Sequence, residues 1–383
     1  MSIGTLSIAN NGNTIFGNGS VSEVSAQLEG LNVTKPFVVT DQGIAESGLL
    51  EKFKKHVPNL GNNSVFLETP ANPNEASVKA ASKAYRDSGA DGIIGFGGGS
   101  PLDLAKAASL SVSHEGPLWK YTTHHNGFKH IGKTPPVIAI PTTAGTGSEV
   151  SRAAVIILDS GEKRIIFSPN LIPDISILDP ELTVGLPPFL TAATGMDAIT
   201  HCIEAISSPR INASADAIGA SALKDALCDG ALLKAVKNGE DLDARSTMLS
   251  VSTRGGMAFS KGLGAVHAMS HACGKDEDLR LHHGTLNAVL LPTVLKFNSD
   301  FLGDKLLLIK TAIGVPKNKD LVGYFLDLNA ELGMPSNLSE MGISSGMLPS
   351  LSEHAVTDNT AATNPIKIDA AGYLELFKQA LSQ

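Results

Sequence analysis

The residues of this sequence best suited to chemistry are one aspartate and several histidines at helical spacing. Asp197 and His201 lie four apart in TGMDAITHCIE, and His267 and His271 repeat that spacing in HAMSH. Side chains four residues apart share one face of an α-helix, so each pair can point at a common target. His283 directly precedes the helical pattern GTLNAVLLPTVLKF. One carboxylate and two or three imidazoles could bind a divalent metal, and a ligand set without thiolates favours Fe(II) or Zn(II).

These residues also have plainer explanations. An isolated Asp or His on a helix commonly caps a helix end, faces solvent or is satisfied inside a core. HAMSH lacks the glutamate of the H-E-x-x-H zinc peptidases, which argues against a hydrolase. His282 has no partner in the pattern, and we expect it to be solvated or to support a neighbouring ligand. Spacing alone leaves open which histidines bind metal and which one moves a proton.

A glycine-rich turn is the first candidate for cofactor binding. Gly97, Gly98, Gly99 and Ser100 stand between the apolar run GIIGF and a helical pattern that opens with Pro101. Glycines allow close approach of the backbone to a ligand, and a helix N-terminus favours a pyrophosphate. The glycines follow the third predicted strand, so they are not the usual Rossmann fingerprint. A tight strand-to-helix turn without a ligand is the alternative.

Two further segments add to the cofactor hypothesis. Asp41 ends the apolar run FVVT, where an acid can bind the adenosine ribose 2′-OH and repel a 2′-phosphate, which favours NAD over NADP. AIPTTAGTGSEV is a second loop of small residues after a strand. Its hydroxyl groups come from Thr142, Thr143, Thr146 and Ser148. Two such loops at adjacent strand ends suit a dinucleotide outside the carboxyl edge of a sheet.

The elements that must position these residues differ between the two halves of the chain. Continuous Val- and Ile-rich runs are typical of strands buried on both faces of a parallel sheet; they span residues 36–40, 64–68, 92–96, 136–140 and 174–179. Helical patterns alternate with them, for example 74–89 with Asn74 as N-cap, and 152–169 is predicted to be a hairpin. This alternation predicts a doubly wound α/β domain. After Leu186 the pattern is mostly helical, so we predict an α/β domain over 1–185 and a helical domain over 186–383.

The composition of the chain argues against several classes of protein. The chain has 383 residues, 42% of them hydrophobic, and a net charge of −8. Its Lys and Arg residues are scattered, which argues against a nucleic-acid partner. Three cysteines fit a reducing cytosol, and the N-terminus lacks the pattern of a signal peptide. No apolar stretch is long enough to span a membrane. We therefore expect a cytoplasmic protein.

Taken in order, the motifs resemble those of the iron-containing (group III) alcohol dehydrogenase family. The resemblance extends over essentially the whole chain and rests on GGGSPLDLAK, PTTAGTGSEV, SPNLIPDISILDPELT, TGMDAITHCIEA, GMAFSKGLGAVHAMSH and HHGTLNAVLLPTVLKFN. It implies a dinucleotide-binding α/β domain, a helical domain, an active site in the cleft between them, and a homodimer or larger homo-oligomer. The implied reaction is metal-dependent, NAD-linked hydride transfer between a small primary alcohol or hydroxy acid and nicotinamide.

The resemblance also implies roles for individual residues. Fe(II), or Zn(II), is expected on Asp197, His201, His267 and His283. His271 is expected to relay a proton, and Phe259 to line the substrate pocket. The residues expected to contact NAD are Asp41, Asn72, Gly98, Gly99, Ser100, Thr142, Thr143, Ser148, Lys163 and Leu182.

Two features depart from the family pattern. The stretch Ala272–His282 is longer and more charged than usual, and His282 stands where the family usually has Pro. These departures leave the substrate open. A hydroxyacid–oxoacid transhydrogenase and a glycerol-dehydrogenase-like polyol oxidation on the same dehydroquinate-synthase-like fold are the enzymatic alternatives. A nucleotide- or metal-binding protein without turnover is the alternative from another class. DNTAATNPI (358–366) is predicted to be a loop whose polar groups face a substrate.

Overall fold

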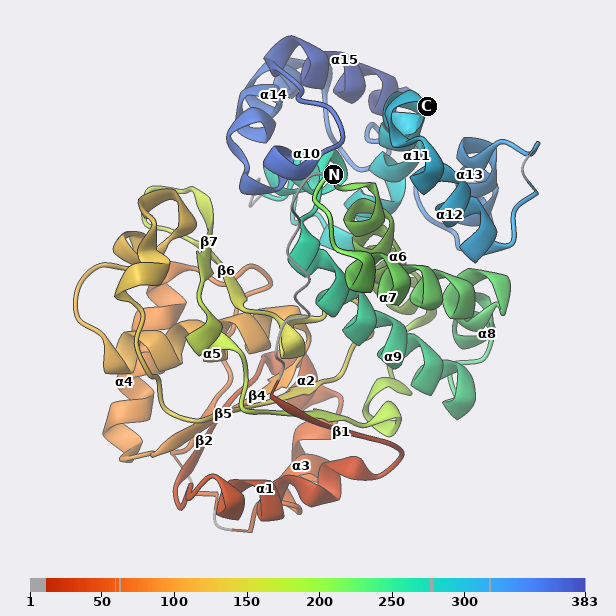
Figure 1. The fold of residues 1–383 in the computed structure, drawn as a ribbon. Coiled ribbons are helices and arrows are strands. Elements are labelled where there is room, and N and C mark those ends of the chain that lie inside the picture. Colours follow the sequence, from red (N-terminus) through yellow and green to blue (C-terminus); the bar gives the residue numbers. More distant parts are fainter. Residues whose placement is uncertain (1–11, 59, 62, 276–278, 317, 383) are drawn as a thin grey trace. The chain divides into compact units, whose positions relative to one another are not determined.

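The structure, a computed structural model, describes residues 12–58, 60–61, 63–275, 279–316 and 318–382 (Figure 1). The N-terminal residues 1–11 and part of the longer stretch, 276–278, lie outside the described residues. The chain divides into two compact units. The sheet unit comprises the described chain from residue 12 to Thr143 and Gly147–Gly185, and the helical unit comprises Ala144–Thr146 and the chain from Leu186 onward.

A six-stranded parallel sheet forms the centre of the sheet unit, in the order β1-β8-β5-β4-β2-β3. Its strands are β1 (Asn13–Phe16), β2 (Pro36–Val39), β3 (Val65–Phe66), β4 (Gly92–Gly97), β5 (Val137–Pro141) and β8 (Ile175–Leu178). In the register, Val38 pairs with Ile94 and Ile94 with Ile138. The five predicted strands are present. β1 was not predicted, because its residues are mostly exposed and the strand pairs only with β8.

Side chains along each strand alternate between the two faces of the sheet, and each face has its own apolar core. Phe37 and Val39 of β2 join one apolar cluster, whereas Val38 between them joins the other. Successive side chains of a strand point to opposite faces, so both faces of this sheet are covered. The helices of this unit are α1 (Val24–Gly30), α2 (Gln42–Glu46), α3 (Leu49–Lys54), α4 (Glu75–Ser88) and α5 (Gly99–Ser113). Parallel strands buried on both faces are the reason for the continuous apolar runs in the sequence.

The N-cap and the hairpin predicted for the sheet unit are confirmed, and one helix begins earlier than predicted. Asn74 caps α4 in a capping box with Ser77. The predicted hairpin is β6 (Ala153–Ile157) paired antiparallel with β7 (Lys163–Phe167). Helix α5 begins at Gly99, two residues before the predicted start at Pro101. Glycine and serine therefore form its first turn, and proline occupies a position whose N–H would have no partner within the helix.

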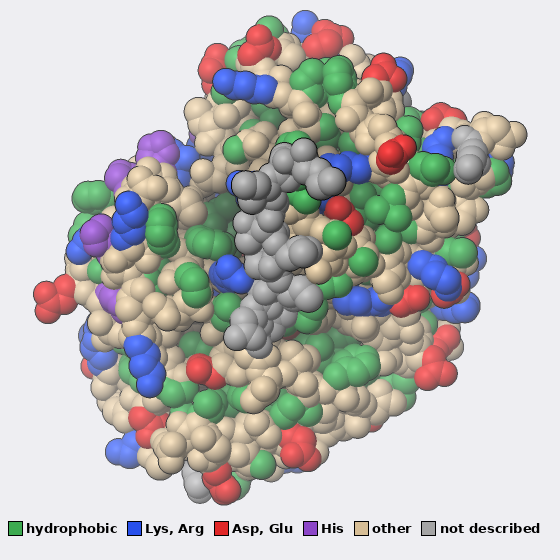
Figure 2. All heavy atoms as spheres, in the orientation of Figure 1, with side chains coloured by type: hydrophobic (Ala, Val, Ile, Leu, Met, Phe, Trp, Pro, Cys, Tyr) green, Lys and Arg blue, Asp and Glu red, His purple; other side chains and the backbone are tan. Residues whose placement is uncertain are grey.

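The helical unit packs around one large apolar cluster that includes Met196 and Ile199. Its helices are α6 (Pro188–Ser207), α7 (Ala213–Leu223), α8 (Ala231–Lys237), α9 (Leu242–Ala258), α10 (Ala265–Cys273), α11 (His283–Leu302), α12 (Asp304–Ile313), α13 (Leu321–Glu331), α14 (Leu348–Thr357) and α15 (Ala370–Leu381). Within the described part of the chain, no helix is both long enough and apolar enough to cross a bilayer. Basic and acidic side chains are interspersed on the face drawn in Figure 2.

Candidate metal centre and cofactor site

Three helices of the helical unit bring the aspartate and histidines together. Asp197 and His201 lie one turn apart in α6, His267 lies near the start of α10, and His283 is the first residue of α11. Gly284 permits the approach of α11 to α6, because a Cβ atom there would lie 2.2 Å from the carbonyl oxygen of Ala193. A side chain at position 284 would therefore push His283 away from Asp197.

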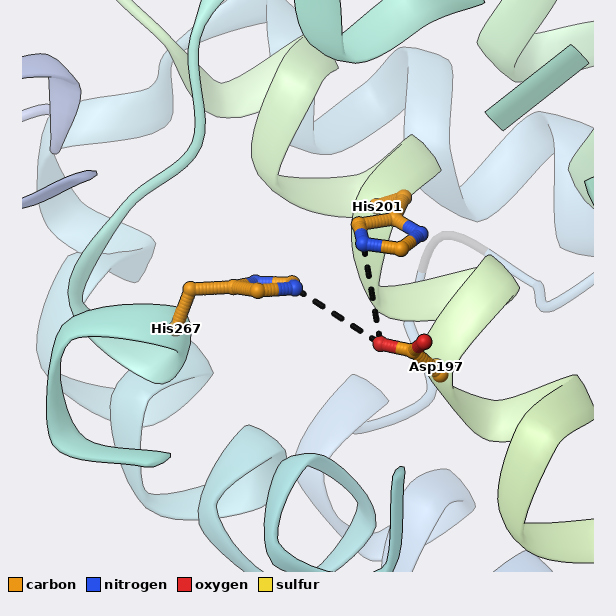
Figure 3. Close-up of side chains that lie close together, drawn as sticks. All are labelled: Asp197, His201 and His267. Atoms are coloured by element: carbon orange, nitrogen blue, oxygen red, sulfur yellow. Dashed lines mark ion pairs between the residues drawn. The ribbon is translucent and has the colours of Figure 1, made fainter. Parts of the chain in front are cut away.

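The imidazoles converge on one carboxylate oxygen. The Nε2 atoms of His201, His267 and His283 each lie 3.6 Å from Asp197 Oδ1. Figure 3 shows the lines from the His201 and His267 rings meeting at this oxygen of Asp197. Asp197, His201 and His267 are buried, and one candidate ligand atom from each lies within 4.8 Å of the others.

A divalent cation fits this donor set. A separation of 3.6 Å exceeds a hydrogen bond, so the imidazoles do not satisfy the carboxylate oxygen directly. A tetrahedral ion with bonds of about 2.1 Å separates its ligand atoms by about 3.4 Å, close to the spacing found here. Three imidazoles and one carboxylate suit Fe(II) or Zn(II) better than Mg²⁺ or Ca²⁺, which prefer oxygen.

The electrostatics of the cluster also favour a cation. Burial on its own would raise the pKa of Asp197, but its electrostatic interactions with His201, His283 and His267 hold that pKa well below its usual range. Burial lowers the pKa of His201 to about 4, which leaves its ring neutral at pH 7. Burial opposes protonation of His267 as well, yet the charges of Glu204 and Asp197 outweigh it and raise the pKa to about 9. A proton on His267 thus balances the buried carboxylates in the absence of a metal.

Three further residues support the cluster, and we did not predict them. Glu204 Oε2 lies 2.6 Å from His267 Nδ1, and its Oε1 accepts a 2.7 Å hydrogen bond from the Val266 amide. Ser270 Oγ lies 2.8 Å from His283 Nδ1. Asn287, one turn after His283, donates from Nδ2 to Asp197 Oδ1 at 2.7 Å. Glu204 and Ser270 contact the Nδ1 atoms of the two histidines, and partners at that position fix the ring orientation and tautomer of metal-binding histidines.

His271 lies beside the cluster but has a different partner. Its ring stacks on His283 with centroids 5.3 Å apart, and its Nδ1 lies 2.9 Å from Asp358 Oδ2. Asp358 Oδ1 accepts hydrogen bonds from the amide and hydroxyl of Thr360. Burial would raise the pKa of Asp358, but His271 and Thr360 lower it to about 2. An ionised Asp358 therefore orients His271 so that Nε2 is the ring atom left to exchange a proton.

The stretch that contains Asp358 differs from its predicted form. Residues Asn359–Thr363 form a 3₁₀-helix capped by Asp358, instead of an irregular loop. Asn364 Oδ1 accepts a hydrogen bond from the amide of Ala265, and Thr363 donates to the carbonyl of Leu263. These polar groups therefore hold the start of α10 in place.

Phe259 and His282 occupy the edge of the cluster. The ring of Phe259 contacts that of His201 edge-on, with centroids 5.0 Å apart. His282 is the N-cap of α11, and its Nδ1 accepts a hydrogen bond from the Thr285 amide at 3.4 Å. Burial lowers the pKa of His282. Its contacts give His282 a helix-capping role beside the metal-binding candidates.

In the sheet unit, predicted cofactor residues lie at the carboxyl ends of three neighbouring strands. Asp41 lies two residues after the end of β2 and caps α2 by accepting a 2.9 Å hydrogen bond from the Ile44 amide. Gly97, at the end of β4, has a φ of +145°, and a Cβ atom there would lie 2.8 Å from Pro101 and 3.5 Å from Asp41 Oδ2. Only glycine suits this position, so the turn brings α5 and the Asp41 carboxylate close together.

Direct contacts join several of the other predicted residues. Lys163 Nζ donates to Asn72 Oδ1 at 3.0 Å, and Ser100 Oγ donates to the carbonyl of Ala71 at 2.5 Å. The amide of Thr142, just after β5, donates to the Gly97 carbonyl at 2.9 Å. A Cβ atom on Gly98 would lie 3.5 Å from Thr143, in ordinary contact. Gly99 starts α5, and Leu182 is buried in the apolar cluster that contains Val38. Their roles in binding NAD remain predictions.

Ser148 belongs to a buried polar network. Its hydroxyl donates to Asp103 Oδ1 at 2.5 Å and accepts from Lys106 Nζ at 2.7 Å. Lys106 Nζ also donates to the carbonyls of Ser148 and Ala153. Burial lowers the pKa of Lys106, against the opposing charge of Asp103. This network ties the loop after β5 to helix α5, and it engages the Ser148 hydroxyl that we predicted to contact the cofactor.

Comparisons with known proteins match both halves of the chain. Residues 11–180 match the model "Iron-containing alcohol dehydrogenase", and residues 191–381 match "Fe-containing alcohol dehydrogenase family, C-terminal". A 4-hydroxybutyrate dehydrogenase from Cupriavidus necator is 42% identical over 371 residues, covering 95% of this chain and 96% of its own.

Solved structures of related enzymes superpose on nearly the whole chain. A 1,3-propanediol oxidoreductase superposes with a TM-score of 0.91 at 32% identity, covering 99% of this chain and all of its own. A sulfoacetaldehyde reductase from Bifidobacterium kashiwanohense, solved with NAD+, superposes with a TM-score of 0.87 at 25% identity over the whole of both chains. The predicted architecture of a parallel α/β domain followed by a helical domain is confirmed. The chain belongs to the iron-containing alcohol dehydrogenase family and is an oxidoreductase of the alcohol and hydroxy acid dehydrogenase type.

Proposed function

We propose that this protein catalyses reversible, NAD-dependent oxidation of the primary hydroxyl group of a small hydroxy acid or alcohol at a divalent metal. The observation that carries the proposal is the convergence of three imidazole Nε2 atoms on Asp197 Oδ1, each at 3.6 Å. The ligands in this proposal are Asp197, His201, His267 and His283. Fe(II), or Zn(II) in its place, supplies a Lewis acid that lowers the pKa of an alcohol oxygen.

The side chains around the metal ligands orient them and move the proton. Glu204 and Ser270 hold the Nδ1 sides of His267 and His283, which keeps their Nε2 atoms directed inward. His271 takes the hydroxyl proton at Nε2 and passes it towards solvent, because Asp358 engages its Nδ1. Imidazole suits this task because a ring nitrogen can both accept a proton and release it. Phe259 covers the edge of His201 and keeps water from it.

The sheet unit binds the nicotinamide cofactor in this proposal. The N-terminus of α5 offers unpaired amides and a positive dipole end to the pyrophosphate. Asp41 receives the adenosine ribose hydroxyls and repels a 2′-phosphate, which makes NAD the preferred cofactor and NADP the poorer one. Asn72 and Lys163, which hydrogen-bond to each other, form a further polar contact for the cofactor.

The relative from Cupriavidus necator suggests the first substrate to test. Because its similarity covers nearly the full length of both chains, we propose 4-hydroxybutyrate as a substrate of this protein. We further propose a homodimer or larger homo-oligomer in the cytoplasm, which rests on the family resemblance and on the three cysteines, all of which are free.

The test is NADH formation from NAD under anaerobic conditions, with Fe(II) or Zn(II) added and omitted. The substrates are 4-hydroxybutyrate, 1,3-propanediol, ethanol and glycerol. We expect metal-dependent NADH formation with 4-hydroxybutyrate or a simple primary alcohol. Hydride exchange between a hydroxy acid and an oxo acid without net NADH would instead identify a transhydrogenase. A preference for glycerol would indicate polyol oxidation, and no NADH with any substrate would contradict the proposal.

A further inference from the structure

Arg152 is a half-buried arginine whose side chain has no partner among the described residues. It follows the 3₁₀-helix Ser148–Val150 and directly precedes β6 in the sheet unit. Its Nε atom is buried and makes no hydrogen bond, and within the described residues its guanidinium has no ion pair. Other arginines of the chain differ: Arg164 pairs with Glu162, and Arg254 pairs with Asp225.

A buried Nε donor without an acceptor is a position where an anion would supply the missing hydrogen bond. Burial of this N–H group removes its hydrogen bonds to water, and no acceptor among the described residues replaces them. Asp103 of the buried network makes no ion pair with Arg152 among the described residues, because Lys106, Ser148 and the amide of Val155 engage its carboxylate. A guanidinium presents its donors in a planar fork that matches a carboxylate.

The backbone of Arg152 is held close to the predicted cofactor loop. Lys106 Nζ donates to the carbonyl of Ala153, the next residue, and also to the carbonyl and hydroxyl of Ser148. The amide of Ser168 donates to the Arg152 carbonyl at 3.0 Å. Arg152 is therefore anchored beside the loop that follows β5, with little freedom in its main chain.

The order of the strands indicates which end of the cofactor this loop meets. β2, β4 and β5 are consecutive neighbours in the sheet. A dinucleotide whose adenosine ribose lies on Asp41 after β2 and whose pyrophosphate lies at the α5 N-terminus after β4 must continue towards β5. Its nicotinamide half then lies over the loop after β5. A substrate must touch the nicotinamide to exchange hydride, so it reaches the neighbourhood of Arg152.

We infer that Arg152 binds the carboxylate of the substrate and selects small hydroxy acids over neutral alcohols. This inference rests on the proposed function. In this inference Arg152 recognises an anion. Besides the substrate carboxylate, the pyrophosphate of the cofactor is the other anion to test. The two sources differ in their consequences: a substrate contact changes the preference among alcohols, whereas a pyrophosphate contact changes the affinity for NAD with every alcohol.

The experiment compares 4-hydroxybutyrate with 1,4-butanediol, in which a hydroxymethyl group replaces the carboxylate. Wild type, Arg152→Gln, Arg152→Lys and Arg164→Gln are assayed for kcat/KM with both substrates and for the KM of NAD with butanediol. Arg164→Gln is the matched control, because this arginine lies on the paired strand β7 but has its own acidic partner. Thermal unfolding of each variant checks the fold.

We expect Arg152→Gln to lower the ratio of kcat/KM for hydroxybutyrate over butanediol by about 10- to 100-fold, the range for a lost hydrogen bond between charged groups. Arg152→Lys should recover part of the ratio, and Arg164→Gln should match wild type. An unchanged ratio in Arg152→Gln would overturn the inference. An equal loss with both substrates, with a raised KM for NAD, would assign Arg152 to the cofactor instead.

Calorimetric titration of 4-hydroxybutyrate into protein saturated with NAD separates this inference from the proposed function. Binding should weaken at least about tenfold in Arg152→Gln whether or not the protein turns over. A wild type that forms no NADH but binds 4-hydroxybutyrate through Arg152 would refute the proposed reaction and retain the carboxylate site. Equal binding by wild type and Arg152→Gln would refute the carboxylate site.

Discussion

Glu204→Gln is the substitution whose effect on the metal centre follows most directly from the structure. Glu204 is 5% exposed, and each of its oxygens has one donor: His267 Nδ1 at 2.6 Å and the Val266 amide at 2.7 Å. Two donors suit a carboxylate, which only accepts. Glutamine has the same shape but one oxygen and one NH₂ group, so it can satisfy only one of the two partners.

Both orientations of the glutamine weaken metal binding. If NH₂ faces His267, the ring must accept at Nδ1 and carry its proton on Nε2, the atom proposed to bind metal. If NH₂ faces the Val266 amide, two buried donors oppose each other, which costs about 1–3 kcal/mol. That free energy corresponds to an affinity about 5- to 150-fold lower, in line with the usual 10- to 100-fold effect of such supporting residues.

The assay is competition for Zn(II) between the apoprotein and a chromophoric chelator, with the visible spectrum of the Co(II)-substituted protein as a second readout. Glu340→Gln is the control, because Glu340 is exposed and hydrogen-bonds Ser336. It should bind Zn(II) as tightly as wild type. If Glu204→Gln bound Zn(II) with wild-type affinity and an unchanged Co(II) spectrum, the inferred tautomer control by Glu204 would be wrong.

Three other predictions concern proton transfer, cofactor choice and pH. His271→Ala should keep its metal and slow turnover with a changed pH profile; metal loss equal to that of a ligand variant, measured by elemental analysis, would reject its separate role. Asp41→Gly should raise kcat/KM for NADP relative to NAD by about tenfold, as expected when a like-charge repulsion is removed, and an unchanged ratio would reject the ribose assignment. The pKa of His267 rises from 6.5 to about 9 in the metal-free fold, so this group contributes stability that is complete below pH 6.5 and lost as the pH rises through 9. The thermal midpoint of the apoprotein should therefore fall over that range, and a midpoint that rises would refute the assignment.

Much of the sheet unit could be predicted because strands buried on both faces of a sheet consist of continuous apolar runs. The runs that form β4 and β5 are buried throughout, as is typical of short strands inside a parallel sheet. β1 has no such apolar run, since NTIF is short and largely exposed. The start of α5 was misplaced because glycine and proline are both compatible with the first turn of a helix.

The pairs within single helices were the predictable part of the site. Asp197 and His201 share a face of α6 because they are four residues apart, and the same rule could have found Glu204, three residues further along that face. Contacts between helices could not be predicted in this way. Asn287 reaches Asp197, and Asp358 reaches His271, only through the packing of α6, α10 and α11 with the chain near residue 358.

The central claim, that Asp197 and three histidines hold the ion on which hydride transfer depends, is tested most directly by metal reconstitution. Protein stripped by a chelator and dialysed anaerobically is titrated with Fe(II), and bound metal and NADH formation from 4-hydroxybutyrate are measured on the same samples. Activity should rise in proportion to bound metal and reach its maximum at about one ion per chain, as for a single catalytic site that keeps a position open for the substrate. His283→Ala should bind little metal and gain little activity. Full activity in the stripped protein, or full activity in His283→Ala without bound metal, would contradict the account.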